Sequence, residues 1–221
     1  MNPVDICLYG ILDPEHCNGR DLAELAIIAA ENGVTILQYR DKINDTRHQI
    51  GAVNEIIEAI SHTDVPLIVN DRVDITLASG AAGVHLGQQD MMVEDARAIL
   101  GPKAVIGLSI KTLDDAHSAP VDLLDYAFIG GVHDTVSKVN PAALGISGWL
   151  ERAAILREMK PDLPLGAIAG FTVENTGDMI EAGAQGIAVI SALFKAENVG
   201  VRIAEFRQAI ESARAKTSVT V

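Results

Sequence analysis

Three short apolar runs in the first half of the chain each end in a cluster of polar side chains. The clusters lie at residues 38–42 (QYRDK), 70–71 (ND) and 87–90 (GQQD). In a parallel barrel the carboxyl ends of the strands share one rim, so we expect these clusters to meet there. Carboxylates suit a hard cation, while cationic and amide side chains suit a multiply charged anion. The sequence therefore predicts a site for a metal ion and a phosphorylated ligand.

Eight apolar runs have the length and composition of buried strands, near residues 6–12, 34–40, 66–71, 83–87, 104–109, 126–131, 163–170 and 186–190. Most gaps hold a helical stripe of apolar residues, over 21–32, 48–61, 93–100, 147–159, 174–182 and 201–213. This alternation is typical of a parallel α/β fold, and eight runs favour a closed barrel over an open sheet. We expect a single-domain (β/α)8 TIM barrel over residues 1–215 and a frayed tail over 216–221.

Composition narrows the class of partner. A chain of 221 residues with 48% hydrophobic residues is long enough for one large core. Its net charge of −13 would repel nucleic acid and anionic lipid, so we expect neither as a partner. The first residues lack the features of a signal peptide, and the two cysteines suit reduced thiols, so we expect a cytoplasmic protein. Assembly into a homo-oligomer stays open.

Polar and small residues also follow the later strand-like runs. Ser109 ends the fifth run, and Thr135, Ser137 and Lys138 lie beyond the sixth in an irregular stretch over 132–146. Gly170 and Ser191 follow the seventh and eighth runs just ahead of helices. Small residues there allow backbone N–H groups to approach a phosphate, a common role of these loops in barrels. The rim thus offers a metal and diphosphate half and a monophosphate half.

Several of these segments resemble thiamine phosphate synthase. The similarity runs from about residue 6 to residue 210 and is carried by 38–42 (QYRDK), 69–74 (VNDRVD), 83–90 (GVHLGQQD), 106–109 (IGLS) and 189–192 (VISA). The resemblance implies a (β/α)8 barrel that joins a hydroxymethylpyrimidine diphosphate to a thiazole phosphate. It also implies that Mg²⁺ assists the reaction and that pyrophosphate is released.

The resemblance implies a role for each matching residue. Asp71 and Asp90 would hold Mg²⁺. The pyrimidine diphosphate would bind at Gln38, Arg40, Lys42 and Asn70, with Ser109 beside the pyrimidine in a catalytic role. A loop with Thr135, Ser137 and Lys138 would reach both substrates, and Lys138 would also be catalytic. The thiazole phosphate would bind at Gly170, Ile190 and Ser191. Departure of pyrophosphate leaves a stabilised carbocation on the pyrimidine, so no strong nucleophile is required.

The chain departs from the family pattern mainly in one loop. Where the family usually reads GPVFxTxTK, residues 130–138 read GGVHDTVSK, without the proline and the aromatic residue. Lys111 replaces a histidine, and Ala169 replaces the first glycine of a Gly-Gly pair, which we expect to crowd the phosphate-binding turn. Two other functions therefore stay open. One is a thiazole tautomerase on the same barrel, and the other is a non-catalytic barrel that binds a phosphorylated ligand.

Structural roles compete with the functional ones at several residues. Asp71 and Asp90 follow strands, where an aspartate more often caps the next helix, but with Asn70, Arg40 and Lys42 on the same rim we favour the metal-ligand role. Arg40 and Lys42 would, in the alternative, lie in solvent or pair with Asp41, which stands between them.

Two histidines raise the same question. His85 lies between apolar neighbours, which favours a hydrogen-bonded core histidine over a catalytic one. His133, in the variant loop, is either a base for an altered reaction or a side chain that fills the space of the missing aromatic residue. We favour the second.

Overall fold

Eight parallel strands close into a barrel in the computed structural model, which describes residues 4–133 and 143–219. Each strand pairs with the next along the chain, and the last pairs with the first through Leu8 opposite Ile187. The strands are β1 (Leu8–Leu12), β2 (Ile36–Tyr39), β3 (Leu67–Asn70), β4 (Gly83–Leu86), β5 (Val105–Ile110), β6 (Tyr126–Gly130), β7 (Leu165–Ile168) and β8 (Gly186–Val189). This topology confirms the predicted single-domain TIM barrel.

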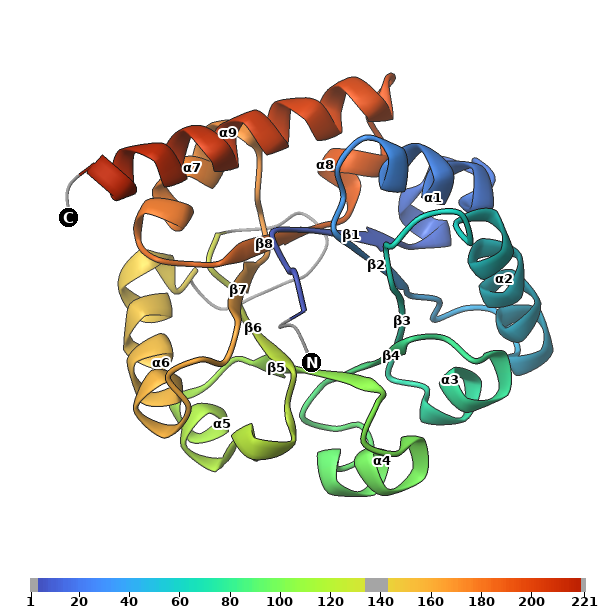
Figure 1. Ribbon diagram of the computed structural model, residues 1–221, viewed down its shortest axis with the longest axis horizontal. Coiled ribbons are helices and arrows are strands. Elements are labelled where there is room, and N and C mark those ends of the chain that lie inside the picture. The colour runs from blue at the N-terminus through green and yellow to red at the C-terminus, as the bar shows by residue number, and fades with distance from the viewer. Residues whose placement is uncertain (1–3, 134–142, 220–221) are drawn as a thin grey trace.

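Helices surround the strands in a ring (Figure 1). They are α1 (Leu22–Glu31), α2 (Thr46–Ala59), α3 (Val73–Ser79), α4 (Val93–Leu100), α5 (Leu113–Ser118), α6 (Gly145–Met159), α7 (Val173–Glu181), α8 (Ser191–Phe194) and α9 (Val199–Val219), with short 3-10 turns η1 (Pro14–His16) and η2 (Val121–Leu123). In the described part of the chain, no helix is both long and apolar enough to cross a bilayer.

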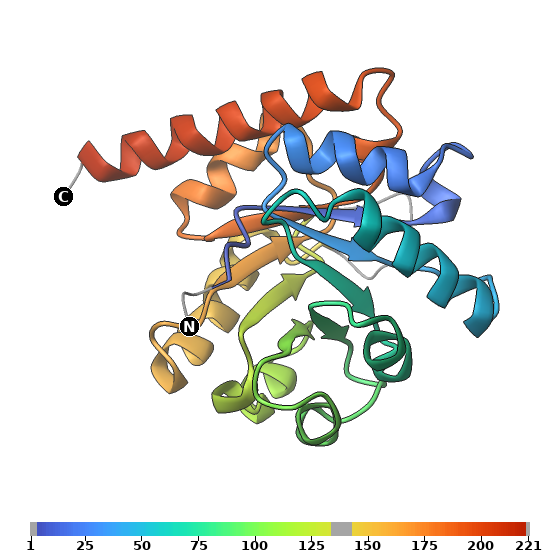
Figure 2. The same cartoon turned by 45° about the vertical axis from the view of Figure 1, so that its right-hand side comes forward.

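All eight predicted strands are present, each within about two residues of its expected ends. The sequence did not predict three short helices, α3, α5 and α8. A helix of seven residues or fewer spans at most two turns, so its apolar residues show little helical periodicity. Residues 216–219, where the sequence predicts a frayed tail, continue α9 to Val219. There Lys216 Nζ lies 2.8 Å from a carboxylate oxygen of Glu181 at the end of α7, and α9 lies along α7 in both views (Figures 1 and 2).

The barrel interior has its own small core, separate from the larger one between strands and helices. Side chains alternate between the two faces of each strand, and the inner cluster consists of Ile6, Tyr9, Ile11, Ile36, Ile68, Tyr126, Phe128 and Ala188. Two glycines make room for its rings. A Cβ on Gly107 would lie 2.1 Å from the Tyr126 ring, and one on Gly166 would lie 2.2 Å from the Phe128 ring. This inner layer forms the floor beneath the carboxyl ends of the strands.

Candidate active site at the carboxyl ends of the strands

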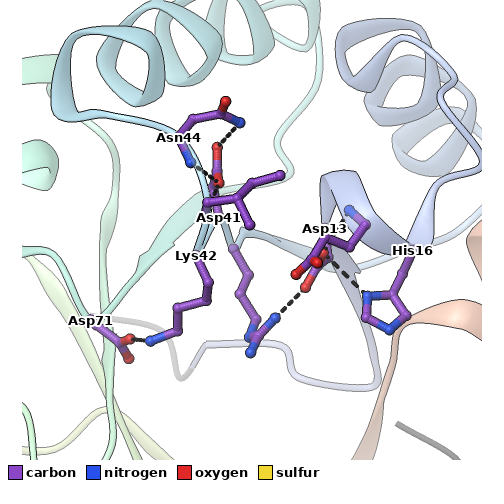
Figure 3. Close-up of polar contacts among 9 residues, drawn as sticks. Asp13, His16, Asp41, Lys42, Asn44 and Asp71 are labelled. Carbon is purple, nitrogen blue, oxygen red and sulfur yellow. Dashed lines mark hydrogen bonds and ion pairs between the residues drawn. The ribbon is translucent and has the colours of Figure 1, made fainter.

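Two carboxylates and one ammonium meet at the ends of β2, β3 and β4. The ammonium of Lys42 binds Asp71 (Figure 3), and the carboxyl of Asp90 is in hydrogen-bonding contact with Asp71. Burial, reinforced by the Asp71 carboxylate, raises the pKa of Asp90, although Gly87 N–H and Lys42 act in the opposite direction. The two acidic residues that the sequence predicted to share one mouth therefore do so.

The alternative role of these aspartates as helix caps is wrong. The residue that caps α3 is Arg72, and the residue that caps α4 is Met92, neither with a side-chain capping bond. Asp90 instead accepts a hydrogen bond of 2.7 Å from the Gly87 N–H within its own turn. Asp71 has a left-handed backbone with φ of +63°, which is uncommon outside glycine, and its side chain binds Lys42 rather than the helix end.

Asp41 holds the loop that carries Lys42. Its carboxylate accepts hydrogen bonds from the Tyr39 hydroxyl at 2.8 Å and from the Ile43 N–H at 2.9 Å. It also accepts from both nitrogens of Asn44 (Figure 3). Burial alone would raise the pKa of Asp41, but these hydrogen bonds lower it below its ordinary value. The alternative that Arg40 or Lys42 forms an ion pair with Asp41 is therefore wrong, because the Asp41 carboxylate is occupied by hydrogen bonds within its own loop.

Arg40 is held from the opposite side by a buried carboxylate at the end of β1. Its guanidinium binds Asp13, which is only 1% exposed. The other oxygen of Asp13 accepts a hydrogen bond of 3.0 Å from the Glu15 N–H and lies 3.2 Å from His16 Nδ1 (Figure 3). A buried, doubly engaged carboxylate fixes the position of the guanidinium at the mouth of the barrel.

A pocket of about 130 Å³ opens at this mouth. Five of the predicted site residues line it: Gln38, Arg40, Asn70, Ser109 and Ile190. The rest of its lining is Tyr9, Ile11, His16, His85, Phe128, Ile168 and Ala188. The pocket combines an apolar, aromatic floor with a few polar groups, which is the usual composition of a site for a small organic ligand.

A row of hydrogen bonds crosses the floor of this pocket. Gln38 Nε2 lies 2.9 Å from the Tyr9 hydroxyl, which lies 2.9 Å from the Tyr126 hydroxyl. The Tyr126 hydroxyl lies 3.2 Å from His85 Nδ1, and His85 Nε2 lies 2.9 Å from Ser109 Oγ. His85 is thus a hydrogen-bonded histidine of the barrel interior, as predicted, but it also lines the pocket.

Burial sets the protonation states along this row. It lowers the pKa of His85 to about 4, against an opposing effect of the Asp71 charge. It also raises the pKa values of Tyr9 and Tyr126 well above that of free tyrosine. All three side chains are therefore neutral at pH 7, and the row carries dipoles rather than charges.

The ends of β7 and β8 carry the residues predicted for a monophosphate. Gly170 has φ of +70° and Ser191 begins α8, but neither lines the pocket described above. The carbonyl of Gly170 accepts a hydrogen bond of 2.9 Å from Asn175 Nδ2. Ala169, which replaces a family glycine, has φ of +98°, a conformation that strains any residue with a Cβ.

The variant loop is only partly described. Thr135, Ser137 and Lys138 lie outside the described residues, so their predicted roles stay predictions. His133 is described, and its ring packs edge-on against Phe171 with centroids 5.1 Å apart. Its Nε2 is buried without a hydrogen-bond partner among the described residues. This packing supports the space-filling role rather than that of a base.

The sequence interpretation missed four polar residues of the mouth and floor: Tyr9, Asp13, His16 and Tyr126. Asp13 and His16 follow β1 directly, so the rule applied to the later strands would have found them. Tyr9 and Tyr126 occupy the inward positions of their strands, which the register with Gln38 and Ser109 would have indicated.

The fold and the mouth define a (β/α)8 barrel whose polar site lies at the carboxyl ends of its strands. The family model described as thiamine monophosphate synthase matches residues 8–193. The chain is 51% identical over 214 residues to the thiamine-phosphate synthase of Agrobacterium fabrum, which covers 96% of this chain and 97% of the relative. The chain belongs to the thiamine monophosphate synthase family.

Further comparisons agree. A thiamine-phosphate synthase of Leptospira biflexa is 40% identical over 198 residues, covering 86% of this chain and 91% of the relative. The solved structure of thiamine phosphate pyrophosphorylase from Pyrococcus furiosus superposes with a TM-score of 0.82 at 30% identity, covering 95% of this chain and 98% of that one. The predicted family resemblance is therefore confirmed over nearly the whole chain.

Proposed function

We propose that this chain is a transferase of thiamine biosynthesis that condenses hydroxymethylpyrimidine diphosphate with thiazole phosphate, giving thiamine phosphate and pyrophosphate. Family membership with 51% identity over almost the full length supports the reaction. The observation that carries the site is the contact of Asp71 with both Lys42 and Asp90 at the carboxyl ends of β2, β3 and β4, next in the chain to Asn70, which lines the pocket.

The donor set at this mouth fits Mg²⁺. Asp71 and Asp90 are hard oxygen ligands, and their mutual repulsion is what a divalent cation relieves. In the described part of the chain, no three acidic, histidine or cysteine side chains gather as a complete metal site. Substrate phosphate oxygens and water would therefore complete the coordination, as is usual for Mg²⁺. When bound, Mg²⁺ would stabilise the negative charge of the departing diphosphate.

The residues of the chain would divide the remaining work between them. Arg40, fixed by Asp13, and Lys42 would bind the diphosphate and stabilise its charge as the C–O bond breaks. Gln38, Asn70 and Ser109 would hold the pyrimidine over the aromatic floor. Because that floor is largely aromatic and its polar groups are paired with one another, it would exclude water from the carbocation until the thiazole adds.

The monophosphate half and the variant loop complete the proposed site. Gly170, Ile190 and Ser191 would receive the thiazole phosphate, and Thr135, Ser137 and Lys138 would reach both substrates, with Lys138 in a catalytic role. The cytoplasm is the proposed compartment, because Cys7 and Cys17 are both free thiols, which a reducing environment favours.

The test is formation of thiamine phosphate by the purified protein with both substrates and Mg²⁺, with thiazole isomerisation measured separately. We expect product with the unmodified chain and a loss of about 100-fold or more in Asp71→Ala. Asp74→Ala is the matched control. Asp74 lies one turn away and pairs with Arg72 at the surface, so its loss should leave the rate within about twofold.

Asp90→Asn tests the metal directly. We expect the Mg²⁺ concentration for half-maximal rate to rise by about tenfold or more, since one charged ligand is lost. No product from the unmodified chain, isomerisation alone, or an unaltered rate in Asp71→Ala would each contradict the proposed function.

A further inference from the structure

The row of hydrogen bonds beneath the pocket has two ends, and both belong to side chains that line the pocket. Gln38 forms one end and Ser109 the other. Tyr9, Tyr126 and His85 lie between them, from three strands that are not neighbours in the chain. The row therefore joins two proposed pyrimidine-binding groups through residues to which the proposed function gives no role.

The distances in this row fit either oxygen of the Tyr9–Tyr126 pair as the donor and either neutral tautomer of His85, so the row has two alternative directions. Gln38 donates from Nε2 to the Tyr9 hydroxyl. From this donor the continuous direction has each tyrosine, which carries a single hydrogen, donate onward, Tyr9 to Tyr126 and Tyr126 to His85. His85 Nδ1 is then an acceptor, and because the ring is neutral its one hydrogen lies on Nε2 and is donated to Ser109 Oγ.

The direction of the row determines what its ends offer to a ligand. In the direction that starts at Gln38, Ser109 receives a hydrogen bond from His85, so its own hydroxyl hydrogen remains available to an acceptor in the pocket. Gln38 has its amide nitrogen directed toward Tyr9, so its carbonyl oxygen remains available to a donor. An aminopyrimidine presents both partners, a ring nitrogen that accepts and an exocyclic amine that donates.

We propose that Tyr9, Tyr126 and His85 are positioning residues that make Ser109 a hydrogen-bond donor and Gln38 an acceptor toward the aminopyrimidine. The identity of the ligand rests on the proposed function, whereas the direction of the row is a property of the protein alone. A row in the opposite direction would present Ser109 as an acceptor and would mismatch the same ring.

Packing fixes the positions of the Tyr9, Tyr126 and His85 rings relative to one another. Phe128 contacts all of them edge-on, with centroids 4.9 Å from Tyr9, 5.7 Å from Tyr126 and 6.1 Å from His85. Tyr126 and His85 stack at 5.5 Å with planes 22° apart. The rings are fully buried or nearly so, which holds each donor and acceptor in one rotamer before any ligand binds.

The first test is the tautomer of His85 in the free protein, observed by NMR of protein with ¹⁵N-labelled histidine. The His85 signals are identified by their absence in His85→Gln. We expect a neutral ring at pH 7 with hydrogen on Nε2 only. A hydrogen on Nδ1, or on both nitrogens, would overturn the proposal, and this result does not depend on whether the chain makes thiamine phosphate.

The second test is the Tyr126→Phe variant, which removes one hydroxyl and leaves the ring. We expect the KM for the pyrimidine diphosphate to rise by about tenfold, while the KM for the thiazole phosphate stays within about twofold. Thr176→Val is the matched control, because it also removes one fully buried hydroxyl but lies on α7 outside the row. That control should leave both KM values unchanged.

Tyr9→Phe interrupts the same row one position earlier and serves where Tyr126→Phe does not fold. An equal rise in both KM values, or no rise in either, would overturn the proposal.

Should the unmodified chain form no product, the pyrimidine alcohol without its diphosphate is the probe, with binding measured by calorimetry. About tenfold weaker binding in Tyr126→Phe would then support the row, and unchanged binding would overturn it.

Discussion

At the scale of single residues, Ala169 shows the cost of a departure from the family sequence. Its φ of +98° is a conformation that glycine adopts freely and alanine does not. We expect Ala169→Gly to raise the free energy of unfolding by about 1 kcal/mol, since relief of strain exceeds the entropic cost of glycine. Urea unfolding measures this. Ala52→Gly, inside α2, is the control and should lower the free energy of unfolding by about 1 kcal/mol. If Ala169→Gly lowered it by a similar amount, the backbone at Ala169 would not be strained.

His85 gives the chain a pH dependence of known sign. Burial lowers its pKa from 6.5 to about 4, so between these values the unfolded chain binds more protons than the folded one. Stability should therefore be fully present above pH 6.5 and fall by up to about 3 kcal/mol as pH drops toward 4. The measurement is urea unfolding in metal-free buffer. His85→Gln should flatten the slope between pH 5 and 6.5, and an unchanged slope would contradict this origin.

Some partners of single residues were not predictable from the sequence. Asp71, Asp90 and Lys42 were found because each follows a strand, and parallel strands bring their ends together. The partner of Arg40 was misjudged because Asp41 is adjacent in sequence, whereas the actual partner, Asp13, lies 27 positions away. Asp41 is instead used by its own loop, a local arrangement that polar composition alone does not specify.

At the scale of elements, β5 makes room for the ring of β6. A Cβ on Gly107 would lie 2.1 Å from the Tyr126 ring. We expect Gly107→Ala to lower the free energy of unfolding by about 2 kcal/mol and to change the tyrosine near-UV circular dichroism. Gly130→Ala is the control, because its nearest neighbour would lie at an ordinary 3.6 Å. Equal stability in the two variants would show that the interior accommodates the extra methyl group.

Strand positions were easier to predict than helix positions. A buried strand needs only four to six residues without charges, and all eight strands met this condition. The short helices α3, α5 and α8 form because the barrel brings consecutive strand ends close together, which requires a compact connection rather than an amphipathic stripe. At α9 the prediction ended early because residues after 213 are polar, yet Lys216 binds Glu181 across to α7.

At the scale of the whole molecule, closure of the barrel depends on the contact of β8 with the chain entering β1. A Cβ on Gly186 would lie 1.8 Å from the carbonyl oxygen of Ile6. We expect Gly186→Ala to lower the free energy of unfolding by about 3 kcal/mol, since backbone must move. Gly51→Ala, in α2 with nothing within 4 Å, should instead raise it by up to about 1 kcal/mol. Equal effects in urea unfolding would contradict the role of this seam.

The closed barrel was predictable because the number of strands and their alternation with helices leave few topologies. Its interior was not, because the hydrogen-bonded row joins residues from β1, β2, β4, β5 and β6 that only closure brings together. A sequence shows which side chains point inward, but the direction of each hydrogen bond depends on which partner it meets across the barrel.

The central claim is that Asp71 and Asp90 bind one divalent cation together with a diphosphate. The most direct measurement is anomalous diffraction from crystals of this protein soaked with Mn²⁺ and pyrophosphate. We expect a single anomalous peak in contact with both carboxylates and with a pyrophosphate that reaches Arg40 or Lys42. A peak that contacts neither aspartate, or pyrophosphate bound at another place on the barrel, would contradict it.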